Sequence, residues 1–288
     1  MKDASSIRLV LMDIDGTIVD SPHHRTVTPE LAQTVRAVAE KGISIGLSSG
    51  RNYGHIMSQM RPIGFTGPFI CNGGAYVVKD DICRFESLLP LSVVDAAWEQ
   101  IWQVQGHIEL SGRSKMYTCV GPGYHGPRFP KVGTDDYLRI LEGKESISSV
   151  RNQNISKITL LVDTREKAER IRSFWETGPF AAEVTLTCSF WFALELTNRG
   201  VTKGSGLEVA AACTNCTAAE TMVIGDGDND VEILRAAGSS FAMANASEAA
   251  MAAAMYRAPS VKEDGARIVL QRYILDGEPL PAPMHAKS

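Results

Sequence analysis

The sequence has little that would mark it as a nucleic-acid-binding or membrane protein. It contains no long basic run, and its 29 Lys and Arg residues against 33 Asp and Glu give a formal net charge of −4. Proteins that hold a phosphate backbone usually concentrate positive charge on one surface. The apolar stretch at residues 7–12 stops at Asp13 and is too short for a signal peptide or a membrane span. We therefore expect a cytoplasmic protein with no nucleic-acid and no membrane partner.

Cysteine is also scarce, with six residues in a chain of 288. They are spread along the chain without a secretory signal, a setting in which thiols normally stay reduced, so we expect no disulfide framework. Cys213 and Cys216 form a lone C-x-x-C pair, and neither a second pair nor a histidine cluster completes a zinc site. What the sequence does contain, 44% apolar and 22% charged residues, is typical of a soluble globular protein. Its length suggests two domains, or one domain with a large insertion.

Short apolar runs alternate with helical patterns at both ends of the chain. The first part follows the order strand, helix, strand, helix, strand, and the same alternation returns after Val201. This order predicts a parallel sheet with helices on both faces, joined by right-handed crossovers. The expected strands are residues 7–12, 43–47, 69–71, 221–224 and 240–243, and the expected helices are 53–60, 202–212, 230–237, 264–275 and one that starts at Pro29 and stops before Gly42.

The middle of the chain follows a different pattern. After a hairpin at residues 75–82, strands and helices no longer alternate regularly, and the layout is that of a sheet with helices on one side. One of these helices is expected after Asp135. We therefore predict an α/β, Rossmann-like doubly wound parallel-sheet core made of residues 1–84 and 195–288, with an α+β domain inserted at residues 85–194.

Four polar clusters lie where a predicted strand ends or a predicted helix begins. They are Asp13-Ile-Asp15-Gly-Thr17, Ser48-Ser49-Gly50-Arg51, Lys203 at a helix start, and the loop 225–230 with three acids within five residues. Ligands bind at the carboxyl ends of the strands in open α/β sheets. The helix dipole disfavours a cation at a helix start, so Lys203 is expected to have an anionic partner. The crowded acids suggest a divalent cation.

Two other interpretations of the acidic loop fail. A calcium-binding EF-hand loop that starts at Asp226 needs Gly at its sixth position and Glu at its twelfth. Those positions hold Val231 and Ala237. A dinucleotide-binding fingerprint needs a third glycine where this chain has Asp230, whose charge would repel a pyrophosphate.

Taken together and in this order, the four clusters resemble the four motifs of the haloacid dehalogenase (HAD) superfamily. Residues 72–75 (Asn-Gly-Gly-Ala), 242–246 and 263–265 further resemble the Cof-type branch, subfamily IIB, in which a cap domain of type C2B is inserted at this place. The resemblance implies the HAD fold, a cap that sets substrate specificity, and chemistry on phosphate esters. Ser49 stands where many relatives have threonine, a difference that keeps the hydroxyl group.

The resemblance also implies a role for each cluster. Asp13 would be the nucleophile that forms an aspartyl-phosphate, Asp15 would act as acid and base, and Lys203 would tie the nucleophile to the phosphate. Asp13, the main-chain carbonyl of Asp15 and Asp226 would ligate Mg²⁺, while Asp230 would ligate it or orient the ligands around it. The residues expected to contact the phosphoryl group or the substrate are Ser49, Gly50, Arg51, Asn72 and Asn229.

These roles predict a Mg²⁺-dependent phosphatase that acts on a small phosphorylated metabolite, with a sugar phosphate favoured. Asp15 favours phosphate-ester cleavage over dehalogenation, because a departing alkoxide benefits from a proton. A phosphomutase, or a non-catalytic protein that binds a phosphorylated ligand, stays open, and the sequence does not indicate an oligomeric state. Candidate contacts to the rest of the substrate, or flanking the site, are Tyr124, His125, Arg128, Lys131, Trp191, Glu195, His23 and His24.

Overall fold

The computed structural model describes residues 6–20, 26–127 and 138–284, and within these ranges the chain forms two β-sheets. The larger sheet has the strand order β14-β13-β12-β1-β2-β3-β4-β5. Neighbours from β14 to β3 pair in parallel, and β4 and β5 add an antiparallel edge. Its strands are β1 (Leu9–Met12), β2 (Ser44–Ser48), β3 (Phe69–Cys71), β4 (Tyr76–Lys79), β5 (Ile82–Glu86), β12 (Thr221–Gly225), β13 (Ser239–Ala242) and β14 (Tyr256–Arg257).

Helices cover both faces of this sheet, because alternate residues of its strands are buried on opposite sides. In β1, Val10 and Met12 belong to one apolar cluster, and Leu9 and Leu11 belong to another. The first cluster contains side chains of α1 (Pro29–Glu40), α2 (Tyr53–Met60) and α8 (Gly265–Val269), and the second contains side chains of α5 (Lys203–Ala212), α6 (Val231–Ala236) and α7 (Glu248–Ala253). The predicted doubly wound α/β core is confirmed.

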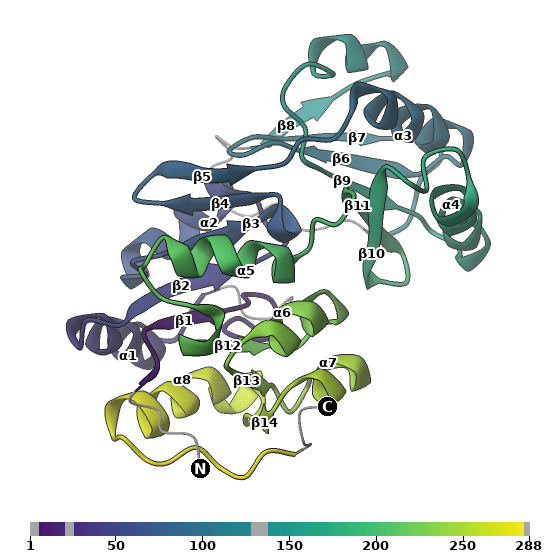
Figure 1. Ribbon diagram of the computed structural model, residues 1–288. Coiled ribbons are helices and arrows are strands. Elements are labelled where there is room, and N and C mark those ends of the chain that lie inside the picture. The colour runs from purple at the N-terminus through teal and green to yellow at the C-terminus, as the bar shows by residue number, and fades with distance from the viewer. Residues whose placement is uncertain (1–5, 21–25, 128–137, 285–288) are drawn as a thin grey trace.

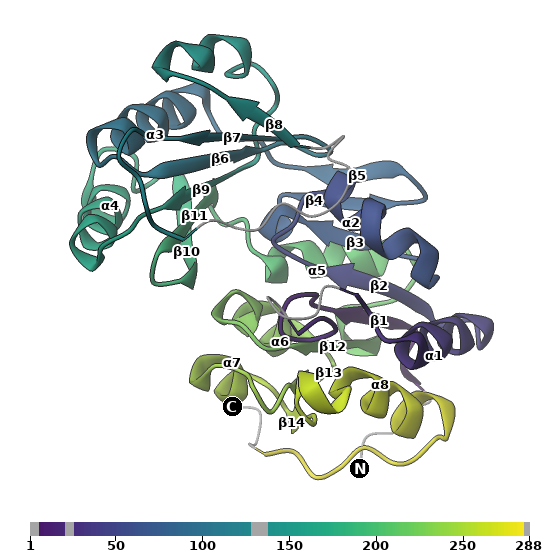
Figure 2. The same ribbon diagram turned by 180° about the vertical axis from the view of Figure 1, so that it is seen from behind.

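The smaller sheet has the strand order β10-β11-β9-β6-β7-β8 and is antiparallel except for the pair β7 and β8. Two helices pack on one of its faces through an apolar cluster that includes Trp98, Ile158 and Ile171. In Figures 1 and 2 this sheet and its helices lie together at one end of the molecule, beside β4, β5 and α5 of the larger sheet. Its elements are α3 (Leu91–Gln103), β6 (His107–Ser111), β7 (Met116–Val120), β8 (Leu138–Leu141), β9 (Lys157–Leu161), α4 (Arg165–Thr177), β10 (Val184–Phe190) and β11 (Ala193–Asn198).

The prediction of a helix after Asp135 is wrong. Residues 138–141 form strand β8 at the edge of the smaller sheet, and a 3₁₀ helix, Lys144–Ser149, follows. The run Leu-Arg-Ile-Leu is too short for its periodicity to separate a helix from a strand. These residues form a strand because they pair in parallel with the edge of β7. Among the residues described, no helix combines the length and the apolar character that crossing a bilayer requires.

Candidate active site

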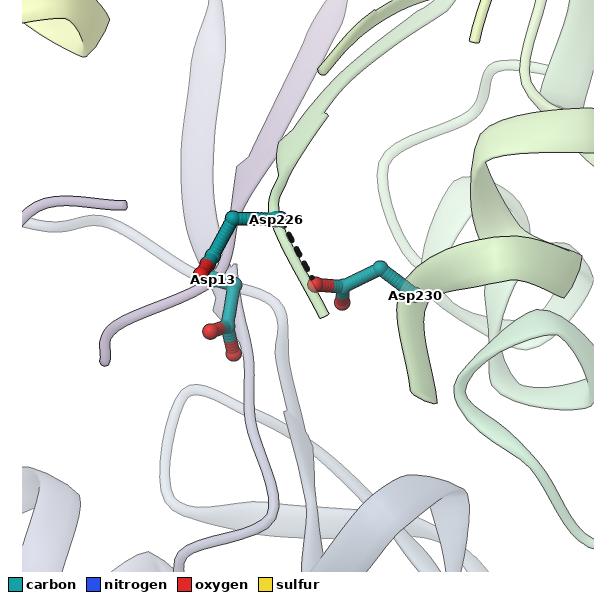
Figure 3. A group of neighbouring side chains, drawn as sticks. All are labelled: Asp13, Asp226 and Asp230. Atoms are coloured by element: carbon teal, nitrogen blue, oxygen red, sulfur yellow. Dashed lines mark hydrogen bonds between the residues drawn. The ribbon is translucent and has the colours of Figure 1, made fainter. Parts of the chain in front are cut away.

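The four polar clusters meet at one edge of the larger sheet. Asp13 directly follows β1, Ser49 follows β2 and Asp226 follows β12. Because β12, β1 and β2 are parallel neighbours, their carboxyl ends lie side by side. In Figure 3 the side chains of Asp13, Asp226 and Asp230 gather at this edge. The topology of the sheet thus brings together residues that lie far apart in the sequence.

Lys203 provides the positive charge at the centre of the cluster. Its ammonium group lies 2.7 Å from Oδ1 of Asp13, 2.7 Å from Oδ1 of Asp230 and 3.4 Å from Oδ1 of Asn229. A capping box between Thr202 and Ser205 begins helix α5 at this lysine, which is buried. Burial alone would lower the pKa of Lys203, but the two carboxylates outweigh it and raise the pKa. The lysine is therefore held charged.

Oxygen atoms of Asp13, Asp226 and Asp230 lie within 4.8 Å of one another. Burial raises the pKa of Asp13 well above its ordinary value and that of Asp226 to about 7, and the neighbouring carboxylates add to both effects. One lysine does not balance this much negative charge. Carboxylate oxygens whose negative charge is not fully balanced are suitable ligands for a hard divalent cation such as Mg²⁺.

Backbone contacts fix the acidic side chains in place. Oδ2 of Asp230 accepts hydrogen bonds from the amides of Asp226 and Gly227, both at 3.0 Å, so this residue braces its own loop as well as Lys203. Oδ1 of Asp226 accepts one from the side-chain hydroxyl of Thr17 at 2.7 Å. Gly16 has φ +87°, and a Cβ atom on it would lie 2.1 Å from Oδ2 of Asp226. Only glycine leaves room for this carboxylate.

Arg51 and Asp15 form a two-point ion pair at the same edge. Nε of Arg51 lies 2.9 Å from Oδ2 of Asp15, and Nη2 lies 2.5 Å from Oδ1. A further hydrogen bond of 2.7 Å to Gln59 orients the guanidinium. Burial would raise the pKa of Asp15, but the hydrogen bonds and charge of Arg51 outweigh it and lower the pKa. The sequence predicted a substrate contact for Arg51, and the structure gives it a protein partner.

Ser49 and Asn72 lie in buried loops beside the acidic cluster. The hydroxyl of Ser49 accepts a hydrogen bond of 3.2 Å from the amide of Arg51. Asn72 has a left-handed φ of 50°, and its amide nitrogen donates to the carbonyl of Gly112 and the hydroxyl of Ser156, at 3.0 and 2.8 Å. Both partners belong to the part of the chain that carries the smaller sheet. Asn72 therefore links the two sheets, and its contact with a substrate stays a prediction.

A family model described as haloacid dehalogenase-like hydrolase matches residues 10–270. The chain belongs to this family. A phosphoglycolate phosphatase of Methanopyrus kandleri is 28% identical over 240 residues, which cover 83% of this chain and 85% of that protein. A 5-amino-6-(5-phospho-D-ribitylamino)uracil phosphatase of Escherichia coli is 27% identical over 271 residues, covering 93% and 97%.

Solved structures of haloacid dehalogenase-like hydrolases share the whole architecture. One from Bacillus subtilis has a TM-score of 0.79 at 21% identity and covers 93% of this chain and 100% of that chain. Another, titled a HAD subclass IIB sugar phosphatase, has a TM-score of 0.73 at 20% identity and covers 92% and 98%. The fold that the motifs implied, a core with an inserted second unit, is confirmed.

The residues proposed for the rest of the substrate are scattered. Tyr124 is buried, and its hydroxyl donates to the carbonyl of Pro127, which makes it a packing residue of its loop. His125 is exposed, and Trp191 is exposed beneath the guanidinium of Arg165. Glu195 is buried and pairs with Lys157 at 2.9 Å. Arg128, Lys131, His23 and His24 lie outside the described residues.

Sequence reasoning missed two charged residues of the smaller sheet, Lys157 and Glu109. Both are buried within strands, Lys157 in β9 and Glu109 in β6. A single polar residue inside a predicted strand does not by itself indicate a functional site. A usable signal was present in the alternation of the strand sequences Lys-Ile-Thr-Leu-Leu and His-Ile-Glu-Leu-Ser. Polar residues at every second position on a strand that is buried on both sides indicate a polar face turned toward another part of the protein.

Replacing Glu109 with glutamine should stabilise the protein at alkaline pH. Burial raises the pKa of Glu109 from 4.5 to about 7 and outweighs the nearby charge of Lys157, which lowers it. A folded-state pKa above the unfolded value means that the stability contributed by this group is present below about pH 4.5 and lost as the pH rises through about 7. Near pH 8 we expect the variant to gain on the order of 3 kcal/mol in unfolding free energy.

Denaturant titrations of both proteins at about pH 5 and about pH 8 check this, with the exposed Glu99 changed to glutamine as a control. The gain of the Glu109 variant should shrink toward the lower pH. A gain that does not change with pH would contradict the raised pKa.

Proposed function

We propose that this protein is a Mg²⁺-dependent phosphatase that hydrolyses a small phosphorylated metabolite through an aspartyl-phosphate. The observation that carries the proposal is the group formed by Asp13, Lys203 and the two acids of the 225–230 loop. In it the carboxylate of Asp13 lies beside a fixed cation and a cluster of acids that fits a divalent metal, at the edge where open α/β sheets bind ligands. The names of relatives in this family, which describe phosphatases, support it.

The proposed reaction has two displacements. In the first, an oxygen of Asp13 forms a bond to phosphorus while the bond from phosphorus to the leaving-group oxygen breaks, and Asp15 gives that oxygen a proton. Because Arg51 lowers the pKa of Asp15 in the free protein, this step requires that substrate binding loosens the pair so that Asp15 takes up the proton. In the second, Asp15 takes a proton from water, the water oxygen bonds to phosphorus, and the bond to Asp13 breaks to release phosphate. Lys203 holds Asp13 and offsets charge on the phosphoryl oxygens. Mg²⁺ bound by Asp13, Asp226 and the carbonyl of Asp15, with Asp230 nearby, would neutralise the same oxygens.

We propose that Ser49, Gly50 and Asn229 bind the phosphoryl group. Ser49 and Gly50 follow β2, next to β1 and its Asp13, and Asn229 already contacts the ammonium of Lys203. We also propose that residues 85–194 act as a cap that closes over this edge of the sheet and excludes water. A sugar phosphate is our favoured substrate class.

The test is release of phosphate from a panel of phosphorylated sugars, nucleotides, short acids and one aryl phosphate, with Mg²⁺ or with EDTA. Turnover that needs the metal would support the proposal. No release from any ester by folded protein with Mg²⁺ would overturn it. Activity that appears only with a bisphosphate activator, with the phosphoryl group retained in the product, would identify a phosphomutase instead.

Changing Asp15 to asparagine should lower kcat more for an ester whose leaving group needs a proton than for one whose leaving group does not. Asparagine keeps the size of the side chain and one oxygen for Arg51 but cannot donate a proton as an acid. We expect kcat on an alkyl phosphate to fall by about 10²–10⁴-fold. The loss on p-nitrophenyl phosphate should be smaller, because p-nitrophenolate leaves without a proton. Equal losses on both esters would show that Asp15 does not serve the leaving group.

A further inference from the structure

Asn72 lies where the smaller sheet meets the core. Its side chain is wholly buried, and its amide nitrogen donates two hydrogen bonds to the part of the chain that carries the smaller sheet, to the carbonyl of Gly112 and the hydroxyl of Ser156. Ser156 is wholly buried too, and its hydroxyl donates to the carbonyl of Ser111 at 3.1 Å. A continuous chain of hydrogen bonds therefore runs from Asn72 in the core into the smaller sheet.

The backbone of the same residue holds the proposed phosphate-binding loop, residues 49–51. The amide of Asn72 donates to the carbonyl of Arg51 at 2.9 Å, and the amide of Gly73 donates to the carbonyl of Ser49 at 3.1 Å. Asn72 has a φ of 50°, a conformation that asparagine tolerates better than most residues. One residue thus binds the smaller sheet through its side chain and the phosphate-binding loop through its backbone.

A second contact docks the smaller sheet on helix α2. The amide of Tyr53, the first residue of this helix, has no partner within the helix and donates to the carbonyl of Arg113 at 2.9 Å. Arg113 belongs to the turn of residues 112–115 between β6 and β7. A Cβ atom built on Gly54 would lie 2.4 Å from the carbonyl oxygen of Ser114, so a side chain at this position would displace the turn.

These contacts depend on one another because their partners all belong to the smaller sheet. If this sheet moves away from the core, the side chain of Asn72 loses the hydrogen bonds to Gly112 and Ser156, and the amide of Tyr53 loses its acceptor. Asn72 then regains conformational freedom, and the loop that its backbone holds is less firmly fixed. A loop binds an anion best when its donors are already oriented, so docking of the sheet favours phosphate binding.

We propose that Asn72 is a positioning residue that couples docking of the smaller sheet to the phosphate-binding loop. Residues 49–51 bind a phosphoryl group tightly only while Asn72 is bonded to Gly112 and Ser156. The inference rests on the proposed phosphatase function and adds a step to it. When the turn of residues 112–115 leaves the core, the affinity of the loop falls, and free phosphate is released as the sheet undocks.

Vanadate, a phosphate analogue without a leaving group, tests this coupling. Its Ki is measured as an inhibitor of p-nitrophenyl phosphate hydrolysis with Mg²⁺ present. Ser156→Ala removes one hydrogen bond of Asn72 from the smaller-sheet side, and Ki should rise by about threefold to tenfold. Asn72→Gly accepts the same φ without strain and removes both bonds, so Ki should rise by about tenfold to a hundredfold.

Three further variants separate coupling from a loss of stability. Adding Ser156→Ala to Asn72→Gly should not raise Ki further, because the bond between these residues is already gone. Gly54→Ala should raise Ki by displacing the turn, although alanine favours a helix more than glycine does. Ser240→Ala is the matched control. Ser240 is a wholly buried serine of β13 whose hydroxyl accepts a hydrogen bond from the amide of Met255 at 3.1 Å, and its loss should leave Ki unchanged. Thermal unfolding of each variant shows whether it is folded.

Coupling is reciprocal, so vanadate should also hold the smaller sheet on the core. The amide of Tyr53 reports docking, because its acceptor is the carbonyl of Arg113 in the turn. Its hydrogen exchange, resolved by NMR, should slow by about threefold or more when vanadate saturates the wild-type protein. In Asn72→Gly the same saturation should leave the exchange rate unchanged.

The outcomes distinguish this inference from the proposed function. If Ser156→Ala and Gly54→Ala leave Ki as the Ser240 control does, Asn72 only holds the two sheets together, and the inference is overturned while the phosphatase stands. Additive losses in the double variant would overturn it as well, since the two effects would then be independent. No release of phosphate by the wild-type protein from p-nitrophenyl phosphate or any other ester would overturn the proposed function, and this inference with it.

Discussion

Replacing Asp13 with asparagine is expected to lower kcat by at least about 10⁴-fold. Removing one member of a catalytic group that acts together typically costs nearly as much as removing the whole group. The fold should persist, because asparagine has the same shape and Lys203 keeps its partner Asp230 at 2.7 Å. Burial, helped by three neighbouring carboxylates, raises the pKa of Asp13, and the uncharged variant no longer carries this cost. The metal-free variant should therefore unfold at no lower temperature than the wild type.

Two measurements check the role of Asp13. Phosphate release gives kcat, and acid quenching during turnover of a labelled ester shows whether phosphate stays on the protein, as it should in the wild type and not in the variant. Asp228 of the acidic loop is exposed, and its change to asparagine is a matched control that should leave kcat within about twofold. Substantial turnover by a folded Asp13 variant would exclude this residue as the nucleophile.

Replacing Lys203 with methionine is expected to cost about 3–5 kcal/mol of unfolding free energy at neutral pH, because it leaves buried carboxylates without their cation. Asp13 and Asp230 both lose a contact of 2.7 Å. Without the lysine the folded-state pKa of Asp13, which burial already raises, rises further. The protein should then regain stability as the pH falls and the carboxylates take up protons. Phosphatase activity should be lost at every pH.

Denaturant titrations at about pH 8 and about pH 5 test this expectation. Lys144 is a matched control, since its partner Glu99 and its own side chain are both about half exposed, 54% and 46%. Its change to methionine should alter the unfolding free energy by less than about 1 kcal/mol at either pH. A loss in the Lys203 variant as small as that of the control would mean that the buried carboxylates find another partner.

Much of the candidate site was predictable because it is built on local rules. Asp13 and Asp226 directly follow short buried strands, and parallel strands place such positions at one edge. Lys203 at the start of a helix called for an anionic partner, and the structure places two carboxylates beside it. Such inferences need only the order of elements along the chain and the direction of the strands.

Pairings between distant segments were not predictable in the same way. Arg51 and Asp15 lie in different motifs, and nothing in either motif shows that the guanidinium faces this carboxylate rather than a ligand. Asn72 was assigned to the substrate, yet its side-chain amide reaches across to the smaller sheet. Strand β8 was mistaken for a helix, because the open edge of β7 outweighs the weak preference of residues 138–141.

The class of fold could be predicted from the residues alone, as could the order of the elements and the acids, lysine and hydroxyl at the sheet edge. These follow from periodicity, from turn and cap residues and from strand ends, all of which are properties of short segments. The folded structure was needed to show which charged side chains face one another, such as Lys157 and Glu195, which lie close to Gly50. The physical reason is that such pairs depend on how two sheets are oriented toward each other, and that orientation is fixed by packing and polar contacts across the whole molecule rather than by neighbours in the chain.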